Sequence, residues 1–314
     1  MKRTLRISVK AIPKLLRKNY NLVFVGFYGH LLMIPVRIIT QKPVLFDAFV
    51  STYDTLVSDR EKFSSDSLAG KLALWLDRYA CKFADHILLD TASHREYFMR
   101  NFGIKPNLIS ALPVGCNEEL FFPRQPKTDG DQTKILYYST YLPLHGVDTV
   151  IEAAKVLEGE PVLFELIGEG QEYERIRTLS KELKLENVVF SPYIPPAELP
   201  ERIAEADICL GGHFGKSAKA ERVIPGKIYQ MLAMAKPVIA TSTTANQELL
   251  VHGESAYFCP PADPSSLAAA IITLAEDHSL RSRIALGGRK KFELDCSEAV
   301  ITNRLGEIIT KLLH

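Results

Sequence analysis

Residues 135–170 read ILYYSTYLPLHGVDTVIEAAKVLEGEPVLFELIGEG, and this stretch decides the fold class. Residues 135–138 form an apolar run that is short enough to be a buried strand. Residues 147–157 then carry apolar side chains at the spacing of one helical face, and residues 162–167 form a second run of strand length. A helix between two such strands predicts an α/β fold, with a parallel sheet and helices packed on its faces.

The same alternation continues along the C-terminal half of the chain. Further strands are expected at residues 188–190, 208–210 and 238–240, with helices at 173–183, 199–206, 228–234 and 246–250.

The N-terminal part follows this pattern with fewer elements. Residues 22–26, 43–46 and 87–89 read as strands, and residues 68–83 read as a helix. Four apolar side chains of this helix are expected to face the core: Leu72, Trp75, Leu76 and Tyr79. The strands are too few for a complete doubly wound domain, so we expect this domain to be incomplete.

The clearest candidate for a domain boundary is residues 123–134, PRQPKTDGDQTK, where polar and turn-forming residues replace the apolar periodicity. We place a linker there, between a truncated Rossmann-like domain at residues 1–122 and a second Rossmann-like domain at residues 135–296. Residues 297–314 read as an amphipathic helix, which is expected to pack back across the two domains.

Chain length and charge indicate how many domains to expect and what the N-terminal segment can bind. The chain has 314 residues, 46% of them apolar and 24% charged, which is enough for two cores of ordinary size. The net charge of +1 conceals a basic start, because the first twenty residues contain no acid and seven cations: Lys2, Arg3, Arg6, Lys10, Lys14, Arg17 and Lys18. Such a segment can bind an anionic membrane surface, and it fits an exposed helix with a solvated basic face equally well.

No apolar run reaches the length of a membrane span, and the first residues lack a secretion signal. The five cysteines are scattered, without metal-ligand spacing. We read them as reduced thiols. We therefore expect a cytoplasmic protein, peripheral on the membrane if the basic segment binds lipid, with no metal site and no nucleic-acid partner.

Ligands of an open parallel sheet bind at the carboxyl ends of its strands, so the loops that follow the strands are the candidate site. Residues 139–146 (STYLPLHG) lead from the first strand into a helix. Gly168 and Gly170 follow the second strand, where missing side chains let a ligand approach the backbone. Glycines there are also ordinary turn residues, and the full dinucleotide fingerprint is absent.

The third loop, residues 211–227 (GGHFGKSAKAERVIPGK), gathers positive charge and leads through Pro225 and Gly226 into a helix. Its cations are Lys216, Lys219, Arg222 and Lys227. Cations beside a helix N-terminus are the combination that binds a diphosphate. The alternative interpretation is a solvated loop whose charges bind no ligand. We favour the diphosphate because the loop follows a predicted central strand.

Residues 225–241, PGKIYQMLAMAKPVIAT, resemble the signature region of family 4 glycosyltransferases, which have the two-domain GT-B fold. Matches in the family's order extend the resemblance over about residues 110–280, at 112–115, 119–121, 146–148, 167–170, 206–208 and 253. The resemblance implies two Rossmann-like domains that bind a nucleoside-diphosphate sugar in the cleft between them. It also implies hexosyl transfer with retention of anomeric configuration and without an obligatory metal or cofactor.

The chain departs from the family at four donor positions. Thr140 and His145 stand where many members have an Arg and a Lys that hold the diphosphate. Arg222 and Gln230 stand where members have two Glu, although Gln230 can still hydrogen-bond the ribose. We therefore expect the diphosphate ligands to come from the third loop: Lys219, Arg222 and Lys227. The other donor-binding candidates are Ser139, Thr140, His145, Gly146, Gly168, Gly170, Pro225 and Gly226.

In the N-terminal domain, Asp47 ends a predicted strand where relatives often have a His. It is the candidate to bind an acceptor or donor-sugar hydroxyl, and it joins Arg222 and Lys227 in the expected catalytic set. The polar residues that follow, beginning at Ser51, equally fit a turn or a helix cap. His30 is a second candidate.

The sequence thus predicts a glycosyltransferase that moves a sugar from a nucleoside-diphosphate sugar to a saccharide or lipid-linked acceptor. The alternative is a non-catalytic nucleotide-sugar-binding protein or a partner subunit of a transferase. The short N-terminal domain motivates this alternative, and a reading frame that begins too late would explain the same feature.

Overall fold

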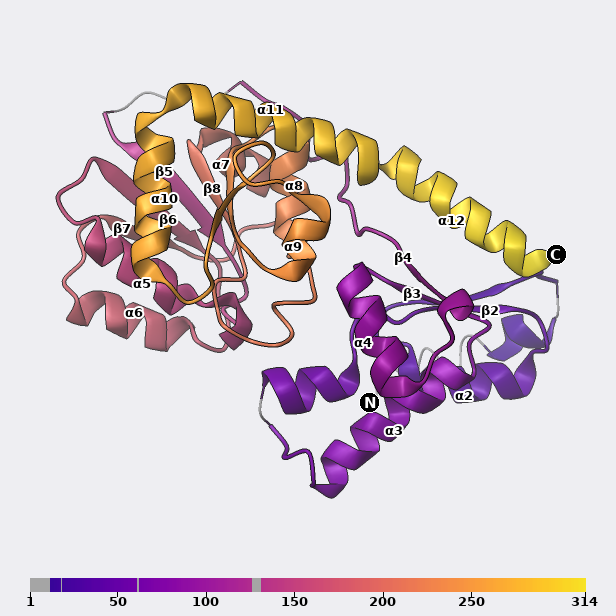
Figure 1. Ribbon diagram of the computed structural model, residues 1–314. Coiled ribbons are helices and arrows are strands. Elements are labelled where there is room, and N and C mark those ends of the chain that lie inside the picture. Colours follow the sequence, from indigo (N-terminus) through magenta and orange to yellow (C-terminus); the bar gives the residue numbers. More distant parts are fainter. Residues whose placement is uncertain (1–11, 18, 61, 126–130) are drawn as a thin grey trace. The chain divides into compact units, whose positions relative to one another are not determined.

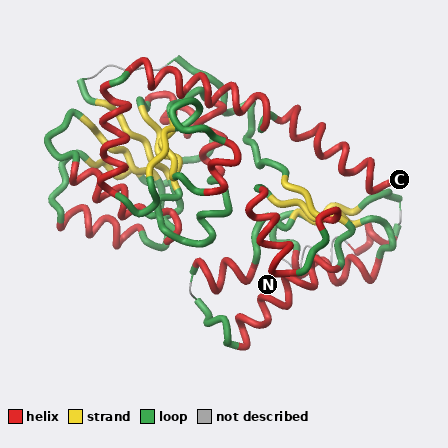
Figure 2. Tube along the Cα trace, in the orientation of Figure 1, coloured by secondary structure: helices red, strands yellow, loops and turns green. Residues whose placement is uncertain are grey.

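The computed structural model describes residues 12–17, 19–60, 62–125 and 131–314. Its contacts divide the chain into unit 1, residues 1–113 with 302–314, and unit 2, residues 114–301. Each unit is an α/β assembly with its own sheet (Figure 2). Four of the N-terminal cations, Lys2, Arg3, Arg6 and Lys10, lie outside the described residues, as do Lys18 and part of the predicted linker, residues 126–130.

Unit 2 contains a six-stranded parallel sheet in the order β10-β9-β8-β5-β6-β7. Figure 1 labels four of these strands, β5 to β8. The strands are β5 (Thr133–Tyr138), β6 (Val162–Ile167), β7 (Val188–Ser191), β8 (Ile208–Gly212), β9 (Val238–Thr241) and β10 (Tyr257–Cys259). The order reverses between β5 and β8, because the chain runs outward through β6 and β7 and then returns to the other side of β5. Such a reversal opens a crevice at the carboxyl ends of the two strands.

Two hydrophobic cores cover the faces of this sheet, because alternate side chains of each strand point to opposite faces. Ile135 and Tyr137 enter one core, and Leu136 enters the other. The first core contains α5 (Val147–Val156), α6 (Tyr173–Glu182) and α10 (Pro264–Glu276). The second contains α7 (Leu199–Glu205), α8 (Gly226–Ala233), α9 (Thr244–Leu249) and the end of α11 (His278–Asp295).

Unit 1 contains a four-stranded parallel sheet in the order β1-β2-β3-β4. Its strands are β1 (Val23–Val25), β2 (Val44–Asp47), β3 (His86–Leu89) and β4 (Ile109–Ala111), the last of which the sequence did not predict. Its helices are α2 (His30–Ile39), α3 (Leu68–Lys82) and α4 (Ala92–Phe102).

The predicted orientation of α3 is wrong. Leu72, Trp75 and Tyr79 lie on its exposed side, whereas its buried side is formed mainly by small residues such as Ala73 and Ala80. The helix is apolar on more than one side, so periodicity alone could not tell which stripe faces the core. The small residues face inward because α3 packs against α2.

The last helix, α12, spans Glu298–Leu313 and contains no fully buried residue. Thr302 onward belongs to unit 1 by its contacts. Among the residues that the structure describes, no helix combines the length and the apolar character that a membrane crossing requires.

Candidate functional site

The loops that follow β5 and β8 contact each other through their backbones. The Phe214 N–H donates to the His145 carbonyl at 3.1 Å, and the Gly215 N–H donates to the Leu144 carbonyl at 3.3 Å. Gly146 has φ +60°, and a Cβ there would lie 2.0 Å from the Gly215 nitrogen. Only glycine fits this position, because any side chain would separate the loops.

The loops that follow β5 and β6 meet in the same way. A Cβ on Gly168 would lie 2.0 Å from the Ser139 carbonyl oxygen, and one on Gly170 would lie 1.8 Å from that of Thr140. The structure therefore brings these four predicted residues together. Both glycines are required by the approach of a neighbouring loop, and their contact with a ligand stays a prediction.

Lys227, in the first turn of α8, is the central cation of this region. Its Nζ is buried and forms no hydrogen bond with the described residues. It lies 3.9 Å from the centroid of the Tyr137 ring, whose π face favours a cation. Burial nevertheless lowers the pKa of Lys227 to about 7, because the ammonium has lost its water without gaining an anionic partner.

Two histidines stack beside this lysine. The His145 and His213 rings are nearly parallel, with centroids 5.3 Å apart. Burial, followed by the charges of Lys227 and Lys219, lowers the pKa of His145 to about 3. Burial also lowers the pKa of His213, again with contributions from the same two lysines. Both rings are therefore neutral at physiological pH and offer donors and acceptors rather than charge.

The sequence reasoning passed over His213, although it directly follows β8 at the reversal of strand order. The His213 Nδ1 is buried and has no hydrogen-bond partner among the described residues. His145, which was predicted, accepts a hydrogen bond from the Leu142 N–H at its Nδ1, 3.3 Å away. The neutral His145 ring therefore carries its proton on Nε2 and can donate from there.

The basic loop continues into α8 without a side-chain cap. Pro225 is the N-cap residue, and neither it nor Gly226 offers a side chain to the unpaired N–H groups of the first turn. Lys219 and Arg222 lie in the preceding turn, where the Arg222 N–H donates to the Lys219 carbonyl at 3.0 Å. The loop thus brings positive charge and a helix N-terminus to one end of the sheet.

Gln230 lies one turn further along α8. Its Oε1 accepts a hydrogen bond of 2.7 Å from the hydroxyl of Tyr138, the last residue of β5. The sequence reasoning did not single out Tyr138, which fixes the position of the amide. Because an amide oxygen has two lone pairs, Gln230 can still accept from a hydroxyl of a ligand.

In unit 1, Asp47 ends β2 as predicted. Burial and the nearby Asp90 carboxylate raise the pKa of Asp47 to about 6. Asp90 directly follows β3, and its Oδ1 accepts a hydrogen bond of 2.7 Å from the His94 Nδ1. Asp90 and His94 are both buried, and the sequence reasoning missed them. Asp90 occupies the same end of its strand as Asp47, which is the signal that could have identified it.

The polar residues after Asp47 have a structural role. Asp77 on α3 accepts hydrogen bonds from the Ser51 hydroxyl at 2.6 Å and from the Tyr53 N–H at 2.9 Å. His30 is buried against the same carboxylate, with its Nε2 3.5 Å from the Asp77 Oδ1. Burial lowers the pKa of His30, and Asp77 opposes this effect. The arrangement fits the turn-and-cap interpretation of this cluster.

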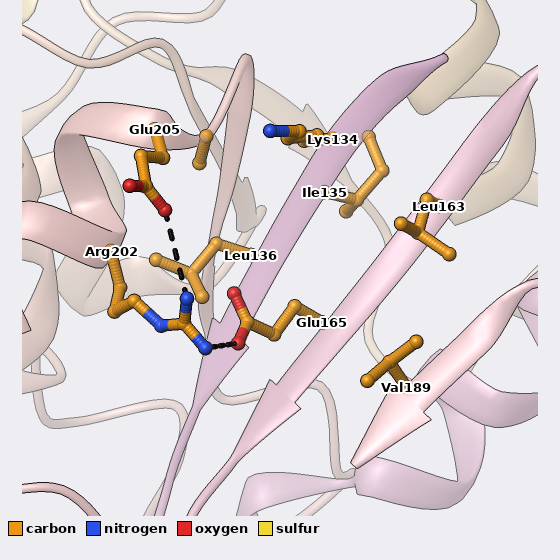
Figure 3. Close-up of a pocket in the computed structure, with 9 residues that line it drawn as sticks. Lys134, Ile135, Leu136, Leu163, Glu165, Val189, Arg202 and Glu205 are labelled. Carbon is orange, nitrogen blue, oxygen red and sulfur yellow. Dashed lines mark hydrogen bonds and ion pairs between the residues drawn. The ribbon is translucent and has the colours of Figure 1, made fainter. Parts of the chain in front are cut away.

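Figure 3 shows a different hollow of unit 2, about 220 Å³ in volume, between β5, β6, β7 and the end of α7. Arg202 pairs there with Glu165 at 2.6 Å and with Glu205 at 3.7 Å. The hollow lies along the first halves of the strands, away from their carboxyl ends. Two cations line it, Lys134 and Arg202, and Arg202 is already paired with acids. It is therefore a poorer anion site than the region around Lys227.

Comparison with known proteins identifies the protein family of this chain. The family described as Glycosyl transferases group 1 matches residues 119–291. The putative colanic acid biosynthesis glycosyltransferase WcaL of Salmonella typhimurium is 24% identical over 67% of this chain and 53% of its own length. The amylovoran biosynthesis glycosyltransferase AmsK of Erwinia amylovora is 23% identical over 73% of this chain and 57% of its length. The chain thus spans about half the length of the curated relatives that it matches.

A solved structure shows the same fold. Anabaena HepE in complex with UDP and glucose superposes with a TM-score of 0.78, over 97% of this chain and 81% of HepE, at 18% identity. The predicted fold class is therefore confirmed: the chain has the GT-B architecture of two Rossmann-like α/β domains.

Proposed function

The chain belongs to the group 1 glycosyl transferases, and from this premise we propose that it transfers a sugar from a nucleoside-diphosphate sugar to a saccharide or lipid-linked acceptor. One observation carries the donor half of the proposal. The buried Nζ of Lys227 has no hydrogen-bond partner in the described part of the chain, and it lies beside the uncapped N-terminus of α8 at the reversal of strand order. A diphosphate supplies the negative charge that this lysine lacks. The UDP in the HepE complex supports the same class of ligand.

Unit 2 is proposed to hold the nucleotide through its own residues. Lys219, Arg222 and Lys227 bind the diphosphate, while Gln230, held by Tyr138, bonds to the ribose. His145 and His213 donate from neutral rings to the phosphate or the sugar. The backbones of residues 139–146 and 168–170 close the region around the donor.

The proposed chemistry is transfer with retention of anomeric configuration and without an obligatory metal. The bond between the sugar C1 and the diphosphate oxygen breaks, and the acceptor oxygen forms its bond to C1 on the same face. The acceptor proton passes to the departing diphosphate. Fixed cations stabilise the charge that develops on that group, and each such contact is worth about 3 kcal/mol by analogy with oxyanion-hole donors.

Asp47 is proposed to accept a hydrogen bond from a sugar hydroxyl. It is ionised above its pKa of about 6, and its carboxylate then has free lone pairs. The curated relatives are named for the biosynthesis of colanic acid and amylovoran, which supports a saccharide as the acceptor class.

A panel of UDP- and GDP-sugars with lipid-linked and free saccharide acceptors tests this function. We expect release of nucleoside diphosphate that depends on the acceptor, in the presence of EDTA, and an NMR coupling constant that shows the anomeric configuration of the donor retained in the product. An inverted product or a requirement for a divalent metal would contradict the mechanism. Tight binding of UDP or GDP without turnover of any donor would favour a non-catalytic binding protein instead.

A further inference from the structure

The outer side of α3 in unit 1 carries an exposed apolar stripe. Leu68, Leu72, Trp75 and Tyr79 are spaced four, three and four residues apart, which places them on one face of the helix. Their exposed fractions are 86%, 60%, 43% and 36%. The Trp75 and Tyr79 rings contact each other, with centroids 4.3 Å apart and planes tilted by 35°. A monomeric soluble protein rarely leaves such a row of large apolar side chains in water without a partner for it.

Positive charge lies along one flank of this stripe. Lys71, Arg78 and Lys82 are exposed on the same helix, and the Lys82 Nζ lies 6.0 Å from the centroid of the Tyr79 ring. The one acid within α3, Asp77, is fully buried and is occupied by the backbone and hydroxyl groups of the segment after β2. The exposed side of α3 is therefore apolar and cationic, with no acid on it.

A hollow of about 430 Å³ continues this surface at the C-terminal end of α3. No acidic side chain is among the described residues that line it. Its lining combines apolar side chains with three cations, chiefly Tyr79, Phe102, Leu108, Arg78, Lys82 and Lys105.

We propose that this α3 surface docks on an anionic lipid bilayer. Leucines on one helical face can enter the acyl boundary, while Trp and Tyr rings prefer the level of the headgroups. Lysine and arginine side chains extend along the apolar surface and place their charges against lipid phosphates. The charge complementarity favours a bilayer over a second copy of this chain, since two such cationic faces would repel each other. The proposal goes beyond glycosyl transfer and does not depend on it.

The chain provides its own probe for this surface, because Trp75 is its only tryptophan. Intrinsic fluorescence of the full chain is measured during titration with vesicles of phosphatidylcholine alone and of phosphatidylcholine with phosphatidylglycerol. With the anionic vesicles we expect a blue shift of the emission and quenching by lipids brominated on their acyl chains. Added salt should weaken the effect, since part of the attraction is electrostatic.

Paired variants locate the contact. Leu68→Gln/Leu72→Gln should abolish the blue shift and the co-sedimentation with anionic vesicles. Leu286→Gln/Leu294→Gln, which changes two exposed leucines of α11, should leave both unchanged.

A second pair tests the charges. Lys71→Gln/Lys82→Gln should lower vesicle affinity about fivefold per cation removed, whereas Lys181→Gln/Lys184→Gln, on the surface of unit 2, should not.

Three results would overturn the proposal. The first is co-sedimentation with vesicles while the Trp75 emission stays unchanged, because the contact would then lie elsewhere. The second is equal binding to neutral and anionic vesicles. The third is a blue shift that grows with protein concentration in the absence of lipid, because a second copy of the chain would then cover the stripe.

Discussion

Lys227 is a buried cation with no anionic partner among the residues that the structure describes. Removing an ammonium from water is costly unless it is paired, so the group responds by releasing its proton more readily. This response explains a pKa of about 7. A bound diphosphate would supply the missing partner, favour the ammonium form and raise that pKa again.

The affinity for UDP or GDP is therefore expected to depend on pH. The pKa of Lys227 is lower in the free protein than in the complex, so binding takes up a proton above about pH 7. Affinity should then fall as pH rises, by up to about tenfold per unit, until the pKa of the complex is passed. Isothermal titration calorimetry from about pH 7 to about pH 9, in two buffers of different ionisation enthalpy, measures both the decline and the proton uptake.

Two variants identify the group that titrates. Lys227→Gln should remove the pH dependence. His145→Gln should preserve it, because a histidine with a pKa of about 3 does not titrate in that range. If the decline persists in Lys227→Gln, another group is responsible and the assignment of Lys227 is wrong.

Gly146 is a residue at which conformation and space both require glycine. Gly146→Ala would force an alanine into φ +60° and place its Cβ 2.0 Å from the Gly215 nitrogen. Gly253→Ala has a similar φ, +74°, but meets no atom within 4 Å. We expect the control to cost about 1 kcal/mol and Gly146→Ala about 3 kcal/mol or more. Urea denaturation followed by circular dichroism compares the two, and equal costs would show that the loops can separate freely.

At the residue scale, the sequence identified the loops but not all the side chains that matter in them. Gly146, Gly168 and Gly170 could be found because they lie in loops that follow strands, where a missing side chain lets another loop or a ligand approach the backbone. His213 and Tyr138 could not be singled out, since their importance arises from burial and from partners distant in the chain.

Among the elements, α8 connects the sheet to the proposed ribose site. The Tyr138 hydroxyl at the end of β5 holds the Gln230 amide at 2.7 Å. Tyr138→Phe should free this amide and weaken uridine and UDP, or guanosine and GDP, by the same factor. A lost neutral hydrogen bond is worth about 0.5–1.5 kcal/mol, which corresponds to about two- to tenfold in affinity. Calorimetry with nucleoside and nucleoside diphosphate measures it, and a loss confined to the diphosphate would contradict this role for Gln230.

Strands were easier to predict than the orientation of helices. Short apolar runs such as β9 are buried on both faces, so their pattern needs no decision about which side faces inward. The helix α3 is apolar on two sides, and only packing against α2 selects the side with Ala73 and Ala80.

At the scale of the whole molecule, unit 2 alone carries the proposed donor machinery. The sequence predicted a parallel sheet from its alternating strands and helices, whereas β10 and the strand order, with its reversal between β5 and β8, come from the structure. In unit 1 the sequence missed β4, because its three residues, Ile109–Ala111, form no distinct apolar run.

The central claim is that cations of the loop before α8 replace the diphosphate ligands missing from the loop after β5. The most direct test is calorimetry of UDP against uridine, and of GDP against guanosine, on the full chain and its variants. Arg222→Gln and Lys227→Gln should each weaken the diphosphate by about 1.5–3 kcal/mol and leave the nucleoside unchanged. Lys216→Gln, an exposed cation of the same loop, serves as the matched control and should have little effect. If Arg222→Gln and Lys227→Gln leave diphosphate affinity intact while His145→Gln abolishes it, the cations have not moved and the account of this site is wrong.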